Sequence, residues 1–378
     1  MLMTLSGRLV TAVAVAAVAA GAQALAWQPP APASAAGAAG PALERAVLQD
    51  AVGTAARAAA VRYWTPARMA AALRAAGDQP TAGKPAQKRR VRRLIRKAPP
   101  TRAPGPAGNT HGKGLRWTRG GAVSAAVGKV FFTLGGTDYV CSGTLVGGRH
   151  PDVVLTAAHC VTGGPGKRGA TQWATDWMFA PGFTDGLLPY GEYTARRFFV
   201  SPDWIKSGGF REQYDAAFVQ VSSATLDGVA DAAKPPPGLP VEFAASQEAA
   251  PPGREYVFGY PAQLPYSGLD LSYCAGPVAA SGGSARTPCG MTAGDSGGPW
   301  LAGFSPRSGR GQVVAVSTYK VTSNPRVLYG AVLGPQARAL YARAVRLARR
   351  SRAPARSPCR SARPPSARPG SASPRSTR

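Results

Sequence analysis

Short apolar segments broken by glycine and proline follow one another from Gly120 onward, and they constrain the fold more than any other feature. Many short strands with turn signals between them predict a β-sandwich or β-barrels. The Pro-rich stretch KPPPGLP at 234–240 divides the region near its middle, so we interpret it as a connector between two β halves. A total of 46 Gly and 36 Pro, with 17% charged residues, disfavours a coiled coil or a helical repeat array. The segments are GKVFFTL, DYVCSGTLVG, DVVLTAAHC, YDAAFVQV, EYVFGY, VVAVSTYKV and VLYGAVLG.

Residues 1–26 are typical of an export signal. Arg8 precedes an Ala/Val/Leu run, and an A-x-A cleavage pattern ends at Ala26. The alternative is a membrane anchor or a buried helix, but the run is dominated by alanine and ends in small residues. No other stretch approaches the roughly 18 apolar residues of a spanning helix, so we expect a secreted protein without a stable membrane anchor.

Residues 27–115 are interpreted as a pro-region. An Ala/Pro/Gly linker leads to helical spacing over 41–63, and a second helix is expected from Thr65, a capping residue, and Pro66 to about Gly77. The basic run KRRVRRLIRK at 88–97 follows. A small helical accessory domain is the alternative.

The C-terminal part is expected to contain one helix and a tail. Apolar residues from Pro335 to Arg350 can share one helical stripe, which predicts a closing helix. The Arg/Ser/Pro-rich tail has too little apolar surface to offset chain entropy. We therefore expect one folded domain over 116–347 and disorder over 348–378.

The positive charge is concentrated outside the β-rich region. The chain has 45 Lys+Arg against 18 Asp+Glu, for a net charge of +27. Residues 84–119 hold 12 basic and no acidic residues and residues 343–378 hold 11 and none, whereas residues 120–342 hold 16 basic and 15 acidic. A folded body with a basic nucleic-acid-binding face is therefore disfavoured.

His159 stands out among the three histidines. It follows an apolar strand in TAAHC at 156–160, whereas His111 lies in a basic segment and His150 in a polar turn, GGRHPD. A lone histidine is usually a satisfied core or surface side chain. The neighbouring motifs favour a catalytic role for His159.

The stretch GDSGGPW at 294–300 presents Ser296 on a tight loop. Its glycines allow sharp turns, and the amides of Gly294 and Ser296 could together bind an oxyanion, each such donor being worth about 3 kcal/mol in a transition state. The pattern G-x-S-x-G also occurs in α/β-hydrolases, but their catalytic histidine follows the serine. No histidine follows His159 here.

Asp215 is the best candidate for the carboxylate that orients the histidine. It begins the apolar strand of QYDAAFVQV, so it is expected to be partly buried. We interpret Asp295 as a structural ion-pair partner that shapes the serine loop. The other candidate acids lie in polar or Gly-rich contexts: Asp176, Asp185, Asp203, Asp227, Asp231 and Asp270.

The order His159, Asp215, Ser296 and the TAAHC and GDSGGP motifs resemble the chymotrypsin/trypsin-like serine endopeptidases. The resemblance covers about residues 117–345 and is closer to exported proteases of high-GC bacteria in GKVFFTLGGTDYVCSGTLVGG and YWTPARM. It implies an all-β fold of two antiparallel six-stranded β-barrels with a C-terminal helix. It also implies an enzyme that acts on protein or peptide substrates without a cofactor or metal. We expect a monomer. Because the sequence after Arg119 is Gly-Gly-Ala-Val, activation through a new N-terminus paired with Asp295 is in doubt.

The family's His-loop bridge implies a disulfide between Cys141 and Cys160, which leaves Cys274 to pair with Cys289. Each disulfide would close a loop and stabilise the folded state by about 3 kcal/mol, because it lowers the entropy of the unfolded chain. Zinc is the competing interpretation, but no C-x-x-C spacing or histidine pair supports it. Cys359 has no evident partner.

The resemblance to the family places Gly290 at the floor of the substrate pocket, so the floor has no carboxylate. Preference for a small or apolar side chain at the cleaved position is therefore expected. The other pocket residues implied are Met291, Val316, Ser317, Thr318 and Tyr319. Two alternatives to an endopeptidase are an inactive protease-fold binding module and a cell-envelope polyanion binder that acts through the basic arms.

Overall fold

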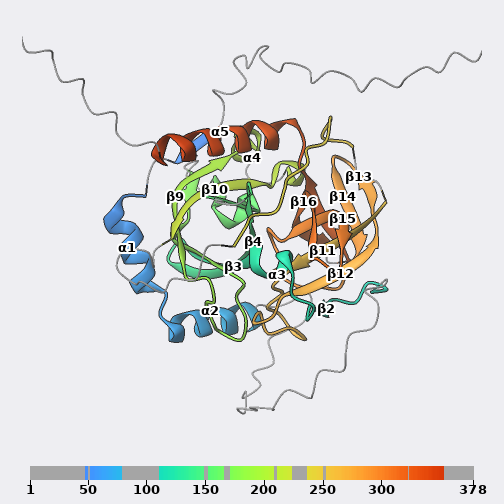
Figure 1. Cartoon of the computed structure of the whole chain (residues 1–378), viewed down its shortest axis with the longest axis horizontal. Coiled ribbons are helices and arrows are strands. Elements are labelled where there is room, and N and C mark those ends of the chain that lie inside the picture. The colour runs from blue at the N-terminus through green and yellow to red at the C-terminus, as the bar shows by residue number, and fades with distance from the viewer. Residues whose placement is uncertain are drawn as a thin grey trace, which may run out of the picture. The chain divides into compact units, whose positions relative to one another are not determined.

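The computed structural model describes residues 47–49, 52–78, 110–148, 152–165, 171–207, 211–223, 236–249, 253–321 and 323–352. The expected signal segment, the basic run at 88–97, His150, Cys359 and the tail after Arg352 lie outside these residues. The described part is mostly β-structure with helices at both chain ends (Figure 1). None of its helices is both long and apolar enough to span a bilayer.

Six strands of the first half form a closed antiparallel barrel. Their order is β9-β10-β5-β4-β3-β8, and β8 pairs again with β9. The strands are almost fully buried because their apolar side chains fill the barrel and also face the helices packed outside it. The strands are β3 (Val127–Leu134), β4 (Thr137–Val146), β5 (Val153–Thr156), β8 (Thr175–Pro181), β9 (Tyr193–Val200) and β10 (Ala217–Ser223).

Short elements complete this half. Strands β6 and β7 form a separate two-stranded sheet, and the 3-10 turn η2 closely follows β5. These elements are α3 (Ala122–Ala126), η2 (Ala158–Cys160), β6 (Thr162–Pro165), β7 (Thr171–Trp173), α4 (Pro202–Lys206) and η3 (Glu212–Tyr214).

The second half forms an open sheet and not the closed six-stranded barrel that was expected. Its order is β13-β14-β17-β16-β15-β11-β12-β2, and no backbone ladder joins β12 to β14 among the described residues. The strands are β2 (Leu115–Arg116), β11 (Arg254–Gly259), β12 (Ser272–Pro277), β13 (Ala279–Ser281), β14 (Ser284–Pro288), β15 (Pro299–Ser305), β16 (Arg310–Val321) and β17 (Asn324–Val332).

The outer edge of β12 is occupied by the chain that enters this half, which explains the open sheet. β2 pairs with Ser272 and Tyr273, and the Thr110 amide donates to Ala275 O at 3.1 Å. The gap to β14 is closed instead by the Cys274–Cys289 disulfide and by the Thr287 hydroxyl, which donates to Pro277 O at 2.8 Å. Residues from Thr110 onward therefore take part in the second sheet.

The described part of the connector, residues 236–240, runs between the halves. The Leu239 amide donates to Leu145 O of the first barrel, and Val241 bridges to Val313 in the second sheet. The expected closing helix is α5 (Pro335–Arg352), which lies on the first barrel beside β9 and β10 (Figure 1). Tyr341 of α5 packs on Phe218 of β10 with 5.3 Å between ring centroids.

The N-terminal segment packs closely against the first barrel. It forms β1 (Val47–Gln49), α1 (Thr54–Tyr63) and α2 (Pro66–Asp78). The helical spacing expected over 41–63 is wrong for 47–49, because the open edge of β9 recruits these residues as a strand. The capping prediction holds, since the Arg68 amide donates to Thr65 Oγ1 at 3.3 Å.

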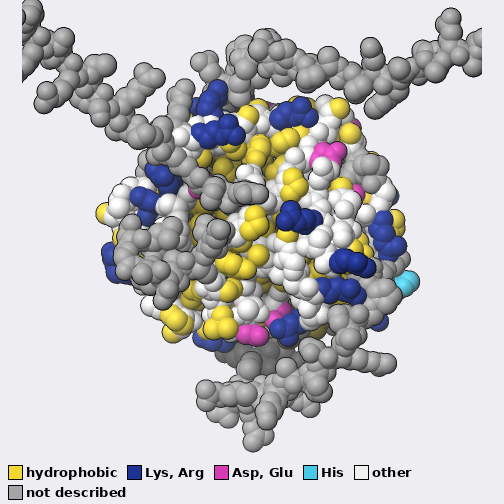
Figure 2. Space-filling model, viewed as in Figure 1, with side chains coloured by type: hydrophobic (Ala, Val, Ile, Leu, Met, Phe, Trp, Pro, Cys, Tyr) yellow, Lys and Arg dark blue, Asp and Glu magenta, His cyan; other side chains and the backbone are white. Residues whose placement is uncertain are grey.

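Basic side chains of the folded body do not form one patch on the face shown in Figure 2. Lys and Arg are scattered there among apolar and neutral side chains. This agrees with the near balance of charge over residues 120–342 in the sequence.

Candidate active site

His159 and Asp215 are in direct contact. His159 lies in η2 at the end of β5, and Asp215 lies between η3 and β10, so the β5–β10 ladder brings the two residues together. Asp215 Oδ2 lies 2.7 Å from His159 Nδ1, and Asp215 Oδ1 accepts the His159 backbone amide at 2.9 Å. Because the carboxylate can only accept, Nδ1 carries the proton and Nε2 is left to act as a base.

The electrostatic environment favours the protonated form of His159. Burial lowers the pKa of its imidazole, but the charge and hydrogen bond of Asp215 act in the opposite direction and are larger together, with a further contribution from Asp295. The net result is a pKa above the usual 6.5. Asp215 itself is only 2% exposed, and its carboxylate is therefore fixed by the two hydrogen bonds to His159.

The loop that carries Ser296 lies against the start of the histidine turn. A side chain at Gly297 would place its Cβ 2.3 Å from Thr156 Oγ1 and 2.7 Å from the Ala157 amide nitrogen, so only glycine fits. Gly297 also has φ of +79°, a conformation that favours glycine. Within the described residues the Ser296 hydroxyl has no hydrogen bond to the imidazole, a contact that often tightens only when substrate binds.

Ser142 of β4 holds this loop at two points. Its amide donates to Ser296 O at 2.7 Å, and its hydroxyl donates to Gly294 O at 2.8 Å. The same hydroxyl accepts the Tyr260 amide at 2.8 Å. The first barrel therefore fixes the backbone on both sides of Asp295.

The two amides expected to bind an oxyanion are available. Those of Gly294 and Ser296 donate no hydrogen bond to any other described residue. Gly294 adopts φ of +101°, which turns the loop sharply. Unpaired amides next to a nucleophile candidate are suited to stabilise developing negative charge.

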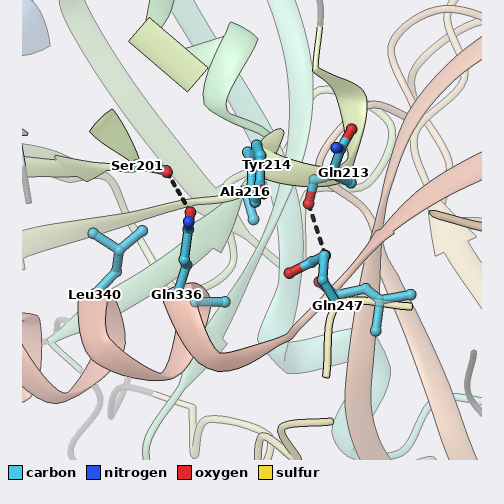
Figure 3. A pocket seen from close by; sticks show the side chains of 9 residues that line it. Ser201, Gln213, Tyr214, Ala216, Gln247, Gln336 and Leu340 are labelled. Atoms are coloured by element: carbon cyan, nitrogen blue, oxygen red, sulfur yellow. Dashed lines mark hydrogen bonds between the residues drawn. The ribbon is translucent and has the colours of Figure 1, made fainter. Parts of the chain in front are cut away.

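A small cavity of about 10 Å³ lies behind the Asp215 turn (Figure 3). Three glutamines border it, Gln213, Gln247 and Gln336. Gln247 donates to Gln213 O at 2.8 Å and to Val332 O at 2.9 Å, while Gln336 of α5 accepts the Ser201 hydroxyl at 2.6 Å. Its size is about that of one water molecule. We interpret the residues that line it as support for the Asp215 turn.

The residues expected to form the substrate pocket are mostly buried. Met291 and Val316 are fully buried in the core. Ser317 is buried too, and it accepts the Gly297 amide through its backbone carbonyl at 2.7 Å. Tyr319 stacks on Tyr329 with 4.7 Å between ring centroids. Thr318 donates to Tyr329 O, and Gly290 faces Gly112 O.

Both expected disulfides are present. Cys141 is bonded to Cys160 beside His159, and Cys274 is bonded to Cys289. Cys141, Cys160 and His159 are also the residues within the described ranges whose donor atoms cluster closely enough for a metal. The sulfurs of the two cysteines are bonded to each other, so the disulfide explains this cluster.

Sequence reasoning missed the residues that support the loops. Ser142 and Gln247 are ordinary polar residues that bind distant backbone atoms, and Gln336 binds the side chains of Ser201 and Asp203. Lys129 is the one missed residue with a visible signal, because a charged residue interrupts the apolar strand GKVFFTL.

Comparisons with known proteins find similar peptidases. A family model described as a trypsin-like peptidase domain matches residues 141–316. The protease Anisep from Arthrobacter nicotinovorans is 35% identical over 58% of this chain and 95% of its own, with a TM-score of 0.49. The thermostable serine protease AL20 from an extremophilic microorganism is 29% identical over 59% of this chain and 99% of its own, with a TM-score of 0.50.

No curated protein matches the chain. The family model and the identity to nearly the whole of Anisep carry the assignment. The chain belongs to the trypsin-like peptidase family and is homologous to serine proteases.

Proposed function

We propose that the protein is a secreted serine endopeptidase in which His159, Asp215 and Ser296 form the catalytic triad. The observation that carries the proposal is the pair of hydrogen bonds from His159 to Asp215, with the Ser296 loop packed against the same turn. Secretion is supported by the two disulfides, which persist in oxidising compartments, and by the signal-like sequence of residues 1–26.

Each residue has a definite role in this reaction. His159 Nε2 accepts the Ser296 proton as Ser296 Oγ attacks the peptide carbonyl carbon. Asp215 holds the tautomer and stabilises the imidazolium, while the Gly294 and Ser296 amides bind the oxyanion. His159 then donates its proton to the leaving amine, and water attacks the acyl-enzyme by the same route.

Hydrolysis of casein tests the proposal. Wild-type protein is expected to cleave casein, and Ser296→Ala is expected to lower turnover about 10⁶-fold. His159→Ala should cost about the same, and combining the two should cost little more, because the residues act as one unit. Asp215→Asn should lower kcat about 10⁴-fold, since an amide favours the wrong tautomer.

Two other outcomes separate the alternatives. Folded wild-type protein without activity would favour a protease-fold binding module. Retention on heparin that depends on the basic arms, again without hydrolysis, would favour a polyanion binder.

The preference at the cleaved position stays a prediction. Gly290 supplies no carboxylate to pair with a substrate Arg or Lys, so small or apolar side chains are expected there. Profiling on a mixed peptide library gives the preference directly. Dominant cleavage after Arg or Lys would contradict it.

A further inference from the structure

The N-terminal helix α2 packs on a loop of the second half, residues 260–268. Leu73 of α2 is 7% exposed, and a Cβ added at Gly268 would lie 2.6 Å from its Cδ2 atom. One helical turn further on, a Cβ added at Gly77 would lie 3.2 Å from Ala262 O. The end of α2 therefore contacts both arms of the 260–268 loop.

A row of buried aromatic rings makes a second connection between the N-terminal segment and this loop. The row begins between α1 and α2, passes through β3 and ends at the first residue of the loop. Close-packed interiors leave few voids, so a displacement at one end is felt at the other. The rings are Trp64, Phe131, Phe183 and Tyr260, with 5.4, 5.7 and 6.1 Å between successive centroids.

The 260–268 loop is hydrogen-bonded in turn to the chain that leads into the oxyanion site. The Ala262 amide donates to Ala293 O at 2.7 Å. The Thr292 hydroxyl accepts the Gln263 amide at 3.1 Å and donates to Gln263 O at 2.9 Å. A Cβ added at Gly294 would lie 3.0 Å from the Cβ of Ala262. The position of Gly294 therefore depends on the position of this loop.

The first barrel holds the start of the same loop. Lys129 of β3 is fully buried, and its ammonium group donates to Tyr260 O at 2.8 Å. The Ser142 hydroxyl accepts the Tyr260 amide and donates to Gly294 O, both at 2.8 Å. Barrel, loop and oxyanion site thus form one hydrogen-bonded unit, and α2 packs on the loop of this unit.

We propose that the N-terminal segment, residues 52–78, is a lasting part of the enzyme that supports catalysis. In this proposal Leu73 is a positioning residue that holds the 260–268 loop against the Gly294–Ser296 site. The inference rests on the proposed function. Because the oxyanion amides act on the transition state, the segment should affect kcat more than substrate binding. A cut between α2 and Thr110 would leave the effect in place while the segment stays bound.

The test compares Leu73→Ala with Leu73→Met and with Arg74→Ala, which removes an exposed side chain from the same helix. The readouts are kcat, KM and the rate of labelling by a fluorophosphonate probe, with near-ultraviolet circular dichroism as the check of folding. Leu73→Ala should lower kcat and the labelling rate about tenfold, with KM changed less than about threefold, because a loosened site should cost less than the 10²- to 10³-fold of a lost oxyanion donor. Leu73→Met, which keeps the volume, and Arg74→Ala should match the wild type.

Hydrogen exchange separates this role from a general loss of stability. In a Ser296→Ala background, Leu73→Ala should speed the exchange of amides in residues 260–268, including that of Ala262. Amides of β16 and β17 should exchange at the rate found without the Leu73 change. A general loss of stability would instead speed exchange in these strands as well.

Gly77→Ala keeps the proposal testable if Leu73→Ala does not fold. Alanine is a better helix former than glycine, so the change should not weaken α2. The added methyl group would press on Ala262 O. The labelling rate and kcat should therefore fall while Tm does not.

The outcomes separate this inference from the proposed function. Failure of the wild type to react with the probe would refute the proposed function. A reactive wild type with a folded, equally reactive Leu73→Ala would overturn the inference alone, and if that variant does not fold, a Gly77→Ala protein with wild-type kcat would do so. Exchange that rises equally in the 260–268 loop and in β16 and β17 would also overturn it, as would a fully active mature enzyme whose native mass lacks residues 52–78.

Discussion

Replacing Trp64 with alanine tests whether the N-terminal helices are an integral part of the folded body. Trp64 follows α1 and is 1% exposed. Its indole nitrogen donates to Asp176 O, and its ring packs on Phe131 of β3 with 5.4 Å between centroids. The side chain therefore joins the helical segment to the barrel wall that also carries Lys129.

The expected loss is about 4 kcal/mol of unfolding free energy. Burial of a Trp removes about 150–250 Å² from water, and at about 25 cal/mol per Å² this contributes roughly 4–6 kcal/mol as an upper value. Measured Trp→Ala changes in cores are about 3–5 kcal/mol. Since a folded domain is stable by only about 5–15 kcal/mol, the change should be large.

The assay is urea unfolding in a Ser296→Ala background, which prevents self-digestion. Leu264→Ala is the control, because Leu264 is 83% exposed and its loss should change stability by less than about 0.5 kcal/mol. A Trp64→Ala loss below about 1 kcal/mol would refute the reasoning and leave the helices as a peripheral attachment.

The result bears on the predicted pro-region. Removal of residues 27–115 stays a prediction, and a mature protein whose mass still includes Trp64 and Pro66 would contradict it. The packing adds that cleavage between α2 and Thr110 would leave residues 52–78 bound to the barrel by their buried side chains. Intact mass under native and denaturing conditions distinguishes release from retention.

Three further predictions concern pH and the second sheet. Because the pKa of His159 is raised above 6.5, kcat/KM should climb with pH and level off only above that value; an inflection at or below 6.5 would contradict the His159–Asp215 pairing. Burial, with a smaller effect of Glu242, raises the pKa of Glu255 from 4.5 to about 7, so the folded state holds a proton that the unfolded state releases and stability falls between these pH values. At pH 8, Glu255→Gln should therefore be more stable than the wild type by up to roughly 3 kcal/mol of unfolding free energy, and it should unfold at a higher urea concentration. Near pH 4 the two proteins should be equally stable. The same difference at both pH values would argue against the charge of Glu255 as its cause. Replacing Cys274 and Cys289 with serine should cost about 3 kcal/mol of unfolding free energy, and an unchanged urea midpoint would show that the β12–β14 seam does not depend on the disulfide.

Local patterns were sufficient to predict several parts of the molecule. Strand texture, the Thr65–Pro66 helix start and the closing helix all follow from short-range signals, since alternation, capping and helical spacing act within a few residues. The motifs around His159, Asp215 and Ser296 were recognisable because each combines a reactive side chain with neighbours that constrain its backbone. The structure brings His159 and Asp215 into contact and places the Ser296 loop against Thr156 and Ala157, at the start of the histidine turn.

The tertiary structure alone decided which edges are paired and which buried groups support the site. The second sheet stays open because residues 110–116 occupy the edge of β12, and Val47–Gln49 becomes a strand because β9 offers an edge. Ser142 and Lys129 acquire their roles from partners more than 100 positions away. The sequence by itself determined the strands and the reactive residues, because these depend on local composition; strand pairing and buried hydrogen bonds depend on which distant segments meet.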